Sequence, residues 1–274
     1  ASFRLLPTIV KIIKSFNTIK YNLPVFKLIY SELEDSDKKN ISAENDIDQS
    51  FQFKNLNIKN LNYSYKSKDE KKIILSNINF NINSGDKIGI KGETGSGKTT
   101  LINLIIGLLN DHQGEIKLNG NNLNYNLLSY QNKIGYVPQS VYLADETILF
   151  NITLDDEKNL DEKKLSKILS LVKLNDFVEK LPNRLNTVIG ERGAKLSGGQ
   201  CQRIGIARAL YRDPSIIVFD EATSSLDEQT ENKILDNLFN NNLDKTIIII
   251  SHRNNSFKYC KKIFEVKNKN LKEL

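Results

Sequence analysis

Apolar residues recur every three or four positions over the first thirty residues of this 274-residue chain, a spacing typical of an amphipathic helix. The apolar stripe consists of Phe3, Leu6, Ile9, Ile13, Phe16 and Ile19. Pro7 lies near the start of this helix, where proline is tolerated best, and Pro24 should end or kink it. Residues 31–50 are polar and lean acidic, a composition that favours a linker. The helix could equally be an ordinary packed helix of the domain that follows.

From Phe51 onward the apolar spacing falls to two, which is typical of strands with one buried face. This spacing predicts short strands within 51–65 and another strand over 73–82. A turn at 84–86 separates them from a strand over 87–91, which enters a glycine-rich loop. The order of elements predicts antiparallel strands first, followed by strand–helix units around a helical insertion.

Strands and helices alternate in the second half of the chain. The expected elements are helices over 99–109, 199–211 and 227–239, and strands over 134–137, 216–219 and 246–251. The last two strands are continuous apolar runs, as in a parallel sheet that is covered on both faces. Between 143 and 188, helical segments alternate with polar breaks. The pattern as a whole predicts an α/β fold.

Composition changes this picture little, because 39% hydrophobic and 26% charged residues are ordinary for a globular protein. The formal charge of +6 could indicate a nucleic-acid or membrane-surface partner. Lysine and asparagine are abundant throughout, however, and no block of like charges marks a nucleic-acid arm. Cys201 and Cys260 lie far apart without metal-ligand spacing, so we expect no zinc site, no disulfide framework and a reducing compartment.

Two absences bear on the extent of the chain. No apolar run reaches the length of about 18 residues that a bilayer-spanning helix needs, and no signal peptide is visible. The chain contains no methionine, even at position 1. We therefore expect it to be a segment of a longer protein.

The residues from Gly92 to Thr99 match the P-loop pattern, with an apolar strand before them and a helix after them. The glycines let successive backbone N–H groups face one phosphate cluster, and the helix N-terminus adds partial positive charge. Lys98 is placed for the β- and γ-phosphates of a nucleoside triphosphate, and the Thr99 hydroxyl for Mg²⁺. A chance match in a flexible loop would lack the flanking strand and helix. The expected phosphate-binding residues are Gly92, Glu93, Thr94, Gly95, Ser96, Gly97, Lys98, Thr99 and Thr100.

A second motif, the apolar strand over 216–219, runs into Asp220 and Glu221. In P-loop enzymes an Asp at such a strand end holds Mg²⁺. The following Glu can polarise a water molecule for attack on the γ-phosphate. By itself an apolar run that ends in Asp-Glu is more often just a strand entering a loop. Together with a P-loop it becomes a strong indication of a nucleotide site.

The pentapeptide Leu196-Ser197-Gly198-Gly199-Gln200 makes the chain resemble the ATP-binding cassette (ABC) ATPases. A Ser followed by two Gly at a helix start makes another anion site, although it is also a simple helix N-cap. The family resemblance implies a P-loop NTPase (RecA-like) core with an antiparallel β subdomain and an inserted helical subdomain. It also implies a head-to-tail dimer with two ATP molecules at the interface. The residues expected to contact ATP in trans are Ser197, Gly198, Gly199, Gln200 and Asp227.

The remaining family motifs follow in order along the chain. Tyr65 resembles the aromatic residue that stacks on adenine, although on the sequence alone an ordinary strand aromatic is the simpler interpretation. Gln139, in Tyr-Val-Pro-Gln, resembles the glutamine that links the nucleotide site to the membrane partner. His252 resembles the histidine that contacts the γ-phosphate, whereas a lone histidine is more often structural. The resemblance thus assigns Mg²⁺ to Thr99, Gln139 and Asp220, and catalysis to Lys98, Gln139, Glu221 and His252.

Two residues depart from the family pattern. Cys201 follows the signature where Arg, Lys or Gln is usual, and we expect it on the exposed first turn of the helix, with little effect on ATP binding. Ser224 takes a place where Ala is also common, which should be harmless.

The segment from Thr187 to Gly193 contains Gly-Glu-Arg-Gly, which resembles the loop by which exporter cassettes contact their membrane domain. The resemblance divides the chain into a cytoplasmic extension of the last transmembrane helix (1–30), a linker (31–50) and a nucleotide-binding domain (51–274) with a helical subdomain at about 143–210. The implied partners are an upstream transmembrane domain in the same full-length chain and a second nucleotide-binding domain, most simply a homodimer. We expect no nucleic-acid partner.

Three short pieces resemble the polysaccharide and lipid-linked oligosaccharide flippase branch of these exporters. They are residues 4–7 (Arg-Leu-Leu-Pro), 21–24 (Tyr-Asn-Leu-Pro) and 137–143 (Val-Pro-Gln-Ser-Val-Tyr-Leu). The expected function is an ATPase that powers export or flipping at the cytoplasmic face of the cell membrane. The alternatives are a soluble ABC-type ATPase that acts on nucleic acid or the ribosome, and a regulatory cassette that binds ATP without turnover.

Overall fold

The computed structural model describes residues 2–41, 48, 50–66, 71–154, 160–223, 225–241 and 244–274. They belong to two compact units, Ala1–Asp48 and Gln49–Leu274. The first unit consists of a single helix, and the second contains both sheets and all the other helices of the described chain.

Helix α1 runs from Ser2 to Ile41, so of the two predicted effects of Pro24, an end or a kink, the helix does not show the end. A proline inside a helix removes one backbone hydrogen bond but does not prevent the helix from resuming. The residues after Pro24 include Leu, Glu and Lys, which favour helix strongly. Helix α1 therefore occupies 31–41 of the predicted linker, and residues 42–47 and 49 of that linker lie outside the described residues.

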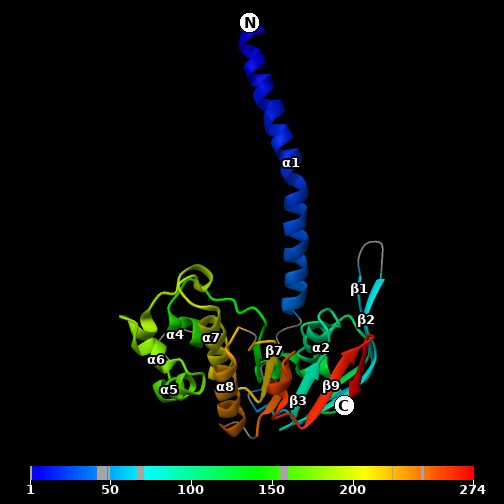
Figure 1. Cartoon of the computed structure of the whole chain (residues 1–274). Helices are drawn as coiled ribbons and strands as arrows, with labels where there is room; N and C mark the ends of the chain where they lie inside the picture. Colours follow the sequence, from blue (N-terminus) through cyan, green and yellow to red (C-terminus); the bar gives the residue numbers. More distant parts are fainter. Residues whose placement is uncertain are drawn as a thin grey trace. The chain divides into compact units, whose positions relative to one another are not determined.

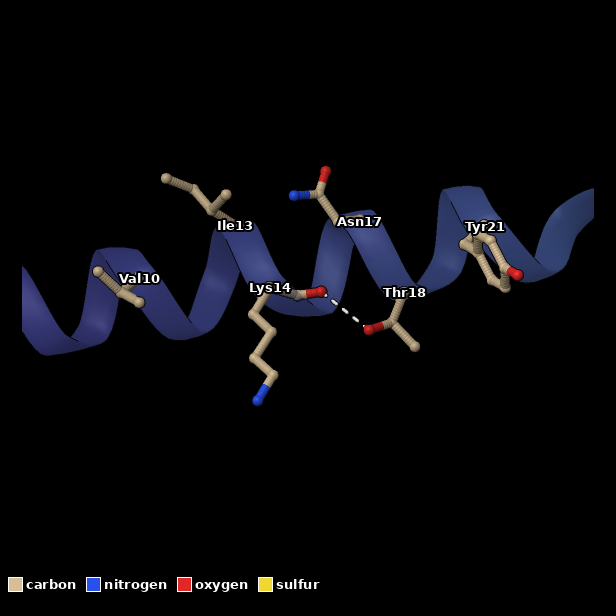
Figure 2. A pocket seen from close by; sticks show the side chains of 6 residues that line it. All are labelled: Val10, Ile13, Lys14, Asn17, Thr18 and Tyr21. Carbon is tan, nitrogen blue, oxygen red and sulfur yellow. Dashed lines mark hydrogen bonds between the residues drawn. The ribbon is translucent and has the colours of Figure 1, made fainter.

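The side chains of α1 over 7–30 are exposed. Many of them are large and apolar, and after Pro24 these include Val25, Phe26, Leu28 and Ile29, which share one broad face of the helix. Figure 2 shows the shallow concavity beside Val10 and Ile13, where the Thr18 hydroxyl donates to the carbonyl of Lys14 at 2.9 Å. All six residues that line it belong to this one helix, so it is open helix surface and not an enclosed cavity.

Four antiparallel strands form the first sheet, in the order β2-β1-β4-β5. These strands are β1 (Asn55–Lys66), β2 (Lys71–Asn83), β4 (Gln113–Leu118) and β5 (Asn121–Asn122). Phe51 and Phe53 lie in an irregular segment before β1, and their side chains are buried in the core. Sequence patterning therefore predicted their burial correctly but placed the start of the strand too early.

The second sheet has six strands in the order β10-β9-β3-β8-β7-β6, and all of them are parallel except β10. They are β3 (Lys87–Lys91), β6 (Ile134–Val137), β7 (Ile216–Asp220), β8 (Thr246–Ile250), β9 (Lys262–Lys267) and β10 (Asn270–Glu273). The predicted strands at 87–91, 134–137, 216–219 and 246–251 match within one residue. The hairpin of β9 and β10 was not predicted, because its short strands alternate less regularly.

Successive side chains of β7 and β8 enter two different hydrophobic cores. Ile217 and Phe219 join one core, whereas Ile216 and Val218 join the other. Helices α7 and α8 pack into the first core and α2 into the second. Both faces of the sheet are thus covered, which is why these strands are apolar without alternation.

The helices of the second unit lie around this sheet (Figure 1). They are α2 (Lys98–Ile105), α3 (Leu127–Gln131), α4 (Ile148–Thr153), α5 (Glu162–Leu171), α6 (Asn175–Glu179), α7 (Gly198–Tyr211) and α8 (Glu228–Asn241). Short 3-10 turns occur at η1 (Leu123–Asn126), η3 (Arg184–Asn186), η4 (Glu191–Gly193) and η5 (Asn254–Phe257). Helices α4, α5 and α6 lie at the end of this unit opposite β1 and β2. Among the residues described, no helix is both long enough and apolar enough to cross a membrane.

Gly114 lets β4 pass a bulge in β1. The register between the two strands shifts after Lys59, and Asn60 has a φ of 49°. A Cβ atom at Gly114 would lie 2.5 Å from the carbonyl oxygen of Asn60, and the residue has a φ of 97°. Only glycine fits both the backbone angle and the space at this position.

We therefore predict that Gly114→Ala lowers the free energy of unfolding by more than the about 1–2 kcal/mol that a left-handed backbone angle costs an alanine. Gly120→Ala is the matched control, because Gly120 has a similar φ of 86° but open space around its Cβ position. Urea denaturation of both variants makes the comparison. Equal losses of stability in the two variants would contradict the steric explanation.

Candidate active site

The loop from Gly92 to Thr99 joins β3 to the N-terminus of α2, as predicted. Gly97, the residue before α2, has a φ of 105°, which turns the chain sharply into the helix. The ammonium group of Lys98 is almost fully buried and donates to the carbonyl oxygens of Gly92 and Glu93, each at 2.9 Å. The first two residues of the loop therefore bind the lysine at its end.

One buried polar atom in this loop is unsatisfied. The Ser96 hydroxyl is inaccessible to solvent and has no hydrogen-bond partner. Buried hydroxyl groups are normally paired, so an orphaned one suggests a missing ligand. A phosphate oxygen beside the N-terminus of α2 would accept from it, and the residues present therefore fit the phosphates of a nucleotide.

Asp220 ends β7 and is buried between two hydroxyl groups. The Thr99 Oγ1 atom lies 3.4 Å from one carboxylate oxygen, and the Tyr136 hydroxyl donates to the other at 3.2 Å. Burial raises the pKa of Asp220 and the neighbouring Glu221 carboxylate adds to this, while both hydroxyl groups act in the opposite direction. Two oxygen ligands this close, one of them anionic, suit Mg²⁺, which prefers oxygen ligands.

The other three predicted catalytic residues meet at Glu221. Its carboxylate lies 3.0 Å from His252 Nε2 and 3.7 Å from Lys98 Nζ. The Gln139 side-chain amide donates to its other oxygen at 2.9 Å. Glu221 itself has a φ of 52°, and its N–H donates to the carbonyl of Ile250 at 3.0 Å. Such backbone conformations in non-glycine residues concentrate at functional sites.

Tyr65 lies near the end of β1 with 45% of its surface exposed. Its ring meets the buried ring of Tyr63 edge to face, with the centroids 5.1 Å apart. This contact holds the Tyr65 ring in place while leaving a flat aromatic face open, which suits stacking on a planar base.

The signature segment begins α7 with a reciprocal cap. Ser197 Oγ accepts from the backbone N–H of Gln200 at 3.3 Å, and the Gln200 side chain accepts from the N–H of Ser197 at 2.7 Å. Asp227 also caps α8, because its side chain accepts from the N–H of Thr230 at 2.9 Å. Ser197, Gly198 and Asp227 are all exposed. Both helix starts are thus preorganised and accessible, which is what a contact with a second molecule requires.

Residues 75–224, more than half of the chain, match the family described as "ABC transporter". The chain belongs to the ABC transporter family.

Its relatives include exporters and flippases. The ABC domain is 36% identical over 219 residues to "ATP-dependent lipid A-core flippase" of Haemophilus influenzae, which covers 80% of this chain and 37% of that protein. It is 34% identical over 264 residues to "ABC transporter B family member 6" of Dictyostelium discoideum, covering 91% of this chain and 38% of that protein. The chain thus spans little more than a third of the length of the curated relatives it matches.

A solved structure of "a bacterial Atm1-family ABC exporter with ATP bound" superposes with a TM-score of 0.75 at 30% identity, over 83% of this chain and 39% of that one. The fold is therefore the mixed α/β ABC ATPase fold, with an antiparallel β subdomain and a parallel core sheet. The predicted fold class is confirmed.

The structure corrects one expectation about the ABC signature helix. Cys201 was expected on an exposed turn, but it is half-buried and packs against the core beneath α7. A Cβ atom at Gly193 would lie 3.1 Å from its sulfur. Burial raises the pKa of the Cys201 thiol, so it is a packing residue more than a reactive one. Thr100 is likewise buried, so its side chain faces the core. Ser224, the other departure from the family pattern, lies outside the described residues.

Tyr136 is a site residue that sequence reasoning missed. It was part of the motif before Gln139, but nothing in the sequence showed that its hydroxyl reaches Asp220. The register of β6 beside β7 brings the two together, with Tyr136 opposite Val218. Burial raises the pKa of Tyr136 far above its usual value, and the Asp220 carboxylate adds to this, so the hydroxyl stays a donor.

We predict that Tyr136→Phe raises the Mg²⁺ concentration needed for half-maximal ATP hydrolysis by about 10-fold, because groups that orient a metal ligand have effects of this size. Phosphate release measured across a Mg²⁺ titration makes the comparison. Tyr130→Phe is the matched control, since it also loses a buried hydroxyl, one that donates to the carbonyl of Ile105 instead. An unchanged Mg²⁺ dependence in Tyr136→Phe would show that the hydroxyl does not orient Asp220.

Proposed function

We propose that this ABC domain hydrolyses ATP as one half of a head-to-tail dimer and thereby powers export or flipping by a membrane domain. The observation that carries the proposal is the convergence of Lys98, Gln139 and His252 on the carboxylate of Glu221. Four separate loops contribute to this cluster, and it lies beside the closed phosphate loop and Asp220.

In the proposed reaction, Glu221 accepts a proton from the attacking water as a general base. Its carboxylate already accepts from Gln139, which orients it. Lys98 and the N–H groups of the loop offset the charge that develops on the γ-phosphate. His252 is within hydrogen-bond distance of Glu221 and would hold the γ-phosphate on its other side. Thr99, Asp220 and Gln139 would hold Mg²⁺, which supplies charge neutralisation between the β- and γ-phosphates.

The dimer rests on the signature segment. Ser197, Gly198 and Gly199 begin α7 with backbone N–H groups at an exposed helix N-terminus. The neighbouring loop supports them, because a Cβ atom at Gly198 would lie 3.7 Å from Ser225 Cβ. In the proposed dimer this surface and Asp227 complete the ATP site of the second subunit, and Tyr65 stacks on the adenine.

A physical link joins the catalytic loop to the segment that resembles the exporter loop. The chain that follows Gln139 pairs with this segment, since Thr147 and Val188 form a β-bridge and Ile189 N–H donates to the carbonyl of Glu146 at 3.1 Å. Movement of Gln139 on ATP binding would therefore reach residues 187–193 directly. This supports delivery of the energy to a membrane domain.

Helix α1 supports the same proposal. Its exposed Val25, Phe26, Leu28 and Ile29 share one broad apolar face, and such a face of a helix is normally covered by another element. We propose that α1 continues from the last transmembrane helix of the full-length protein, at the cytoplasmic face of the membrane. Similarity to lipid A-core flippases supports an amphiphilic, saccharide-bearing lipid as the substrate class.

We predict that Glu221→Gln lowers the rate of ATP hydrolysis by about 100-fold or more, which is the range for a lost general base. The variant should still bind ATP with Mg²⁺, because its loop and Asp220 are intact, and should then accumulate as a dimer. Phosphate release and sedimentation with ATP measure the two effects. Glu179→Gln, at the exposed end of α6, is the control. A normal rate in Glu221→Gln would mean that the base is another residue.

The rival function, an ABC-type ATPase that acts on nucleic acid or the ribosome, predicts a different response. A transport ATPase should hydrolyse ATP at the same rate with and without added DNA, RNA or ribosomes. The measurement is phosphate release at low ionic strength, because the +6 charge would favour any such binding there. Clear stimulation that salt abolishes would favour the rival.

A further inference from the structure

We propose that Glu231 is a positioning residue that fixes His252 relative to Glu221 during ATP hydrolysis. This inference rests on the proposed roles of those two residues. Glu231 lies in the first turn of α8, and only 1% of its surface is exposed. A buried carboxylate is costly unless it is paired and hydrogen-bonded, so its partners show what it holds.

The Glu231 carboxylate receives donors from two different loops. The Thr223 hydroxyl donates to it at 2.7 Å and the Ser256 hydroxyl at 2.8 Å. The Arg253 guanidinium forms an ion pair with its second oxygen. All of these donors serve the ionised form, and two neutral donors with one cation satisfy a buried carboxylate well.

These partners surround the two catalytic residues along the chain. Thr223 comes two residues after Glu221, and Arg253 comes directly after His252. Ser256 also shares a hydrogen bond of 3.0 Å with Ser251, the residue directly before His252. Glu231 therefore holds the backbone on both sides of His252 and the turn that follows Glu221.

The same network reaches the loop that begins α8. The Arg253 guanidinium also donates to the carbonyl of Leu226 at 3.2 Å. Leu226 precedes Asp227, one of the residues expected to contact the second subunit. One carboxylate thus ties the His252 loop, the Glu221 turn and the Asp227 loop to a rigid helix.

The consequence is specific to the chemical step. Without the Glu231 carboxylate, His252 and Glu221 would lose their fixed separation of 3.0 Å. Lys98 and Ser96 lie in the segment from Gly92 to Thr99. Lys98 comes within 3.5 Å of His252, but it is held by the Gly92 and Glu93 carbonyls, which do not involve Glu231. The affinity for ATP should therefore stay while the rate falls.

The test is Glu231→Gln, which keeps the size of the side chain but removes the charge that pairs with Arg253. We expect kcat to fall by about 10- to 100-fold, the effect of a displaced catalytic group, with KM for ATP within about twofold of its original value. Ile234→Ala is the matched control, because Ile234 is fully buried in the same helix but belongs to the apolar core. Both variants are assayed well below their unfolding temperatures, with ATP affinity measured separately.

Combining each substitution with His252→Ala in a double variant distinguishes a failure of this inference from a failure of the proposed function. If Glu231 acts through His252, Glu231→Gln should change kcat by less than about twofold in the His252→Ala background. An unchanged kcat in Glu231→Gln, or an equal loss in Ile234→Ala, would overturn the positioning role while leaving the proposed function intact. A normal rate in His252→Ala would instead overturn the role of His252, and this inference with it.

Discussion

Parallel strands carry the loops of the ABC active site to a single edge of the six-stranded sheet. Ile90 pairs with Ile250, and Ile250 pairs with Asp220, so these residues lie in one row across β3, β8 and β7. Strand β6 ends beside β7 in the same direction. The phosphate loop, Glu221, His252 and Gln139 follow directly after these strand ends. The site therefore depends on the register of the sheet, which the buried isoleucine runs hold in place.

In the proposed dimer, a single chain holds half of each nucleotide site. The phosphate loop, the proposed Mg²⁺ ligands and the proposed base meet around Glu221, whereas Ser197 and Asp227 present capped, exposed helix starts. Lys98 donates to two loop carbonyls and lies near Glu221. The phosphates of a nucleotide would interact with that ammonium group and with the Ser96 hydroxyl. The proposed binding and catalytic roles thus involve the same charges.

Two connections lead outward from this cluster. Glu231 ties the loops of Glu221, His252 and Asp227 to α8, on the side where the second subunit is proposed to bind. The chain after Gln139 pairs with residues 187–189, on the side proposed to meet the membrane domain. A site with one connection of each kind can pass a change at the γ-phosphate both to its dimer partner and to the transport machinery.

The sequence alone determined the fold class and the family, and it predicted the residues that the structure brings together around Glu221. Continuous apolar runs and a glycine-rich loop between strand and helix are local features, and local features can be read along a chain. It missed the β9–β10 hairpin and the burial of Cys201, because these depend on neighbours distant in sequence. It also placed the end of α1 too early, because it gave Pro24 more weight than the helix-favouring residues that follow. Only the tertiary structure brought the Tyr136 hydroxyl to Asp220 and Glu231 to Arg253. Those contacts arise from strand register and helix packing, which no single stretch of sequence records.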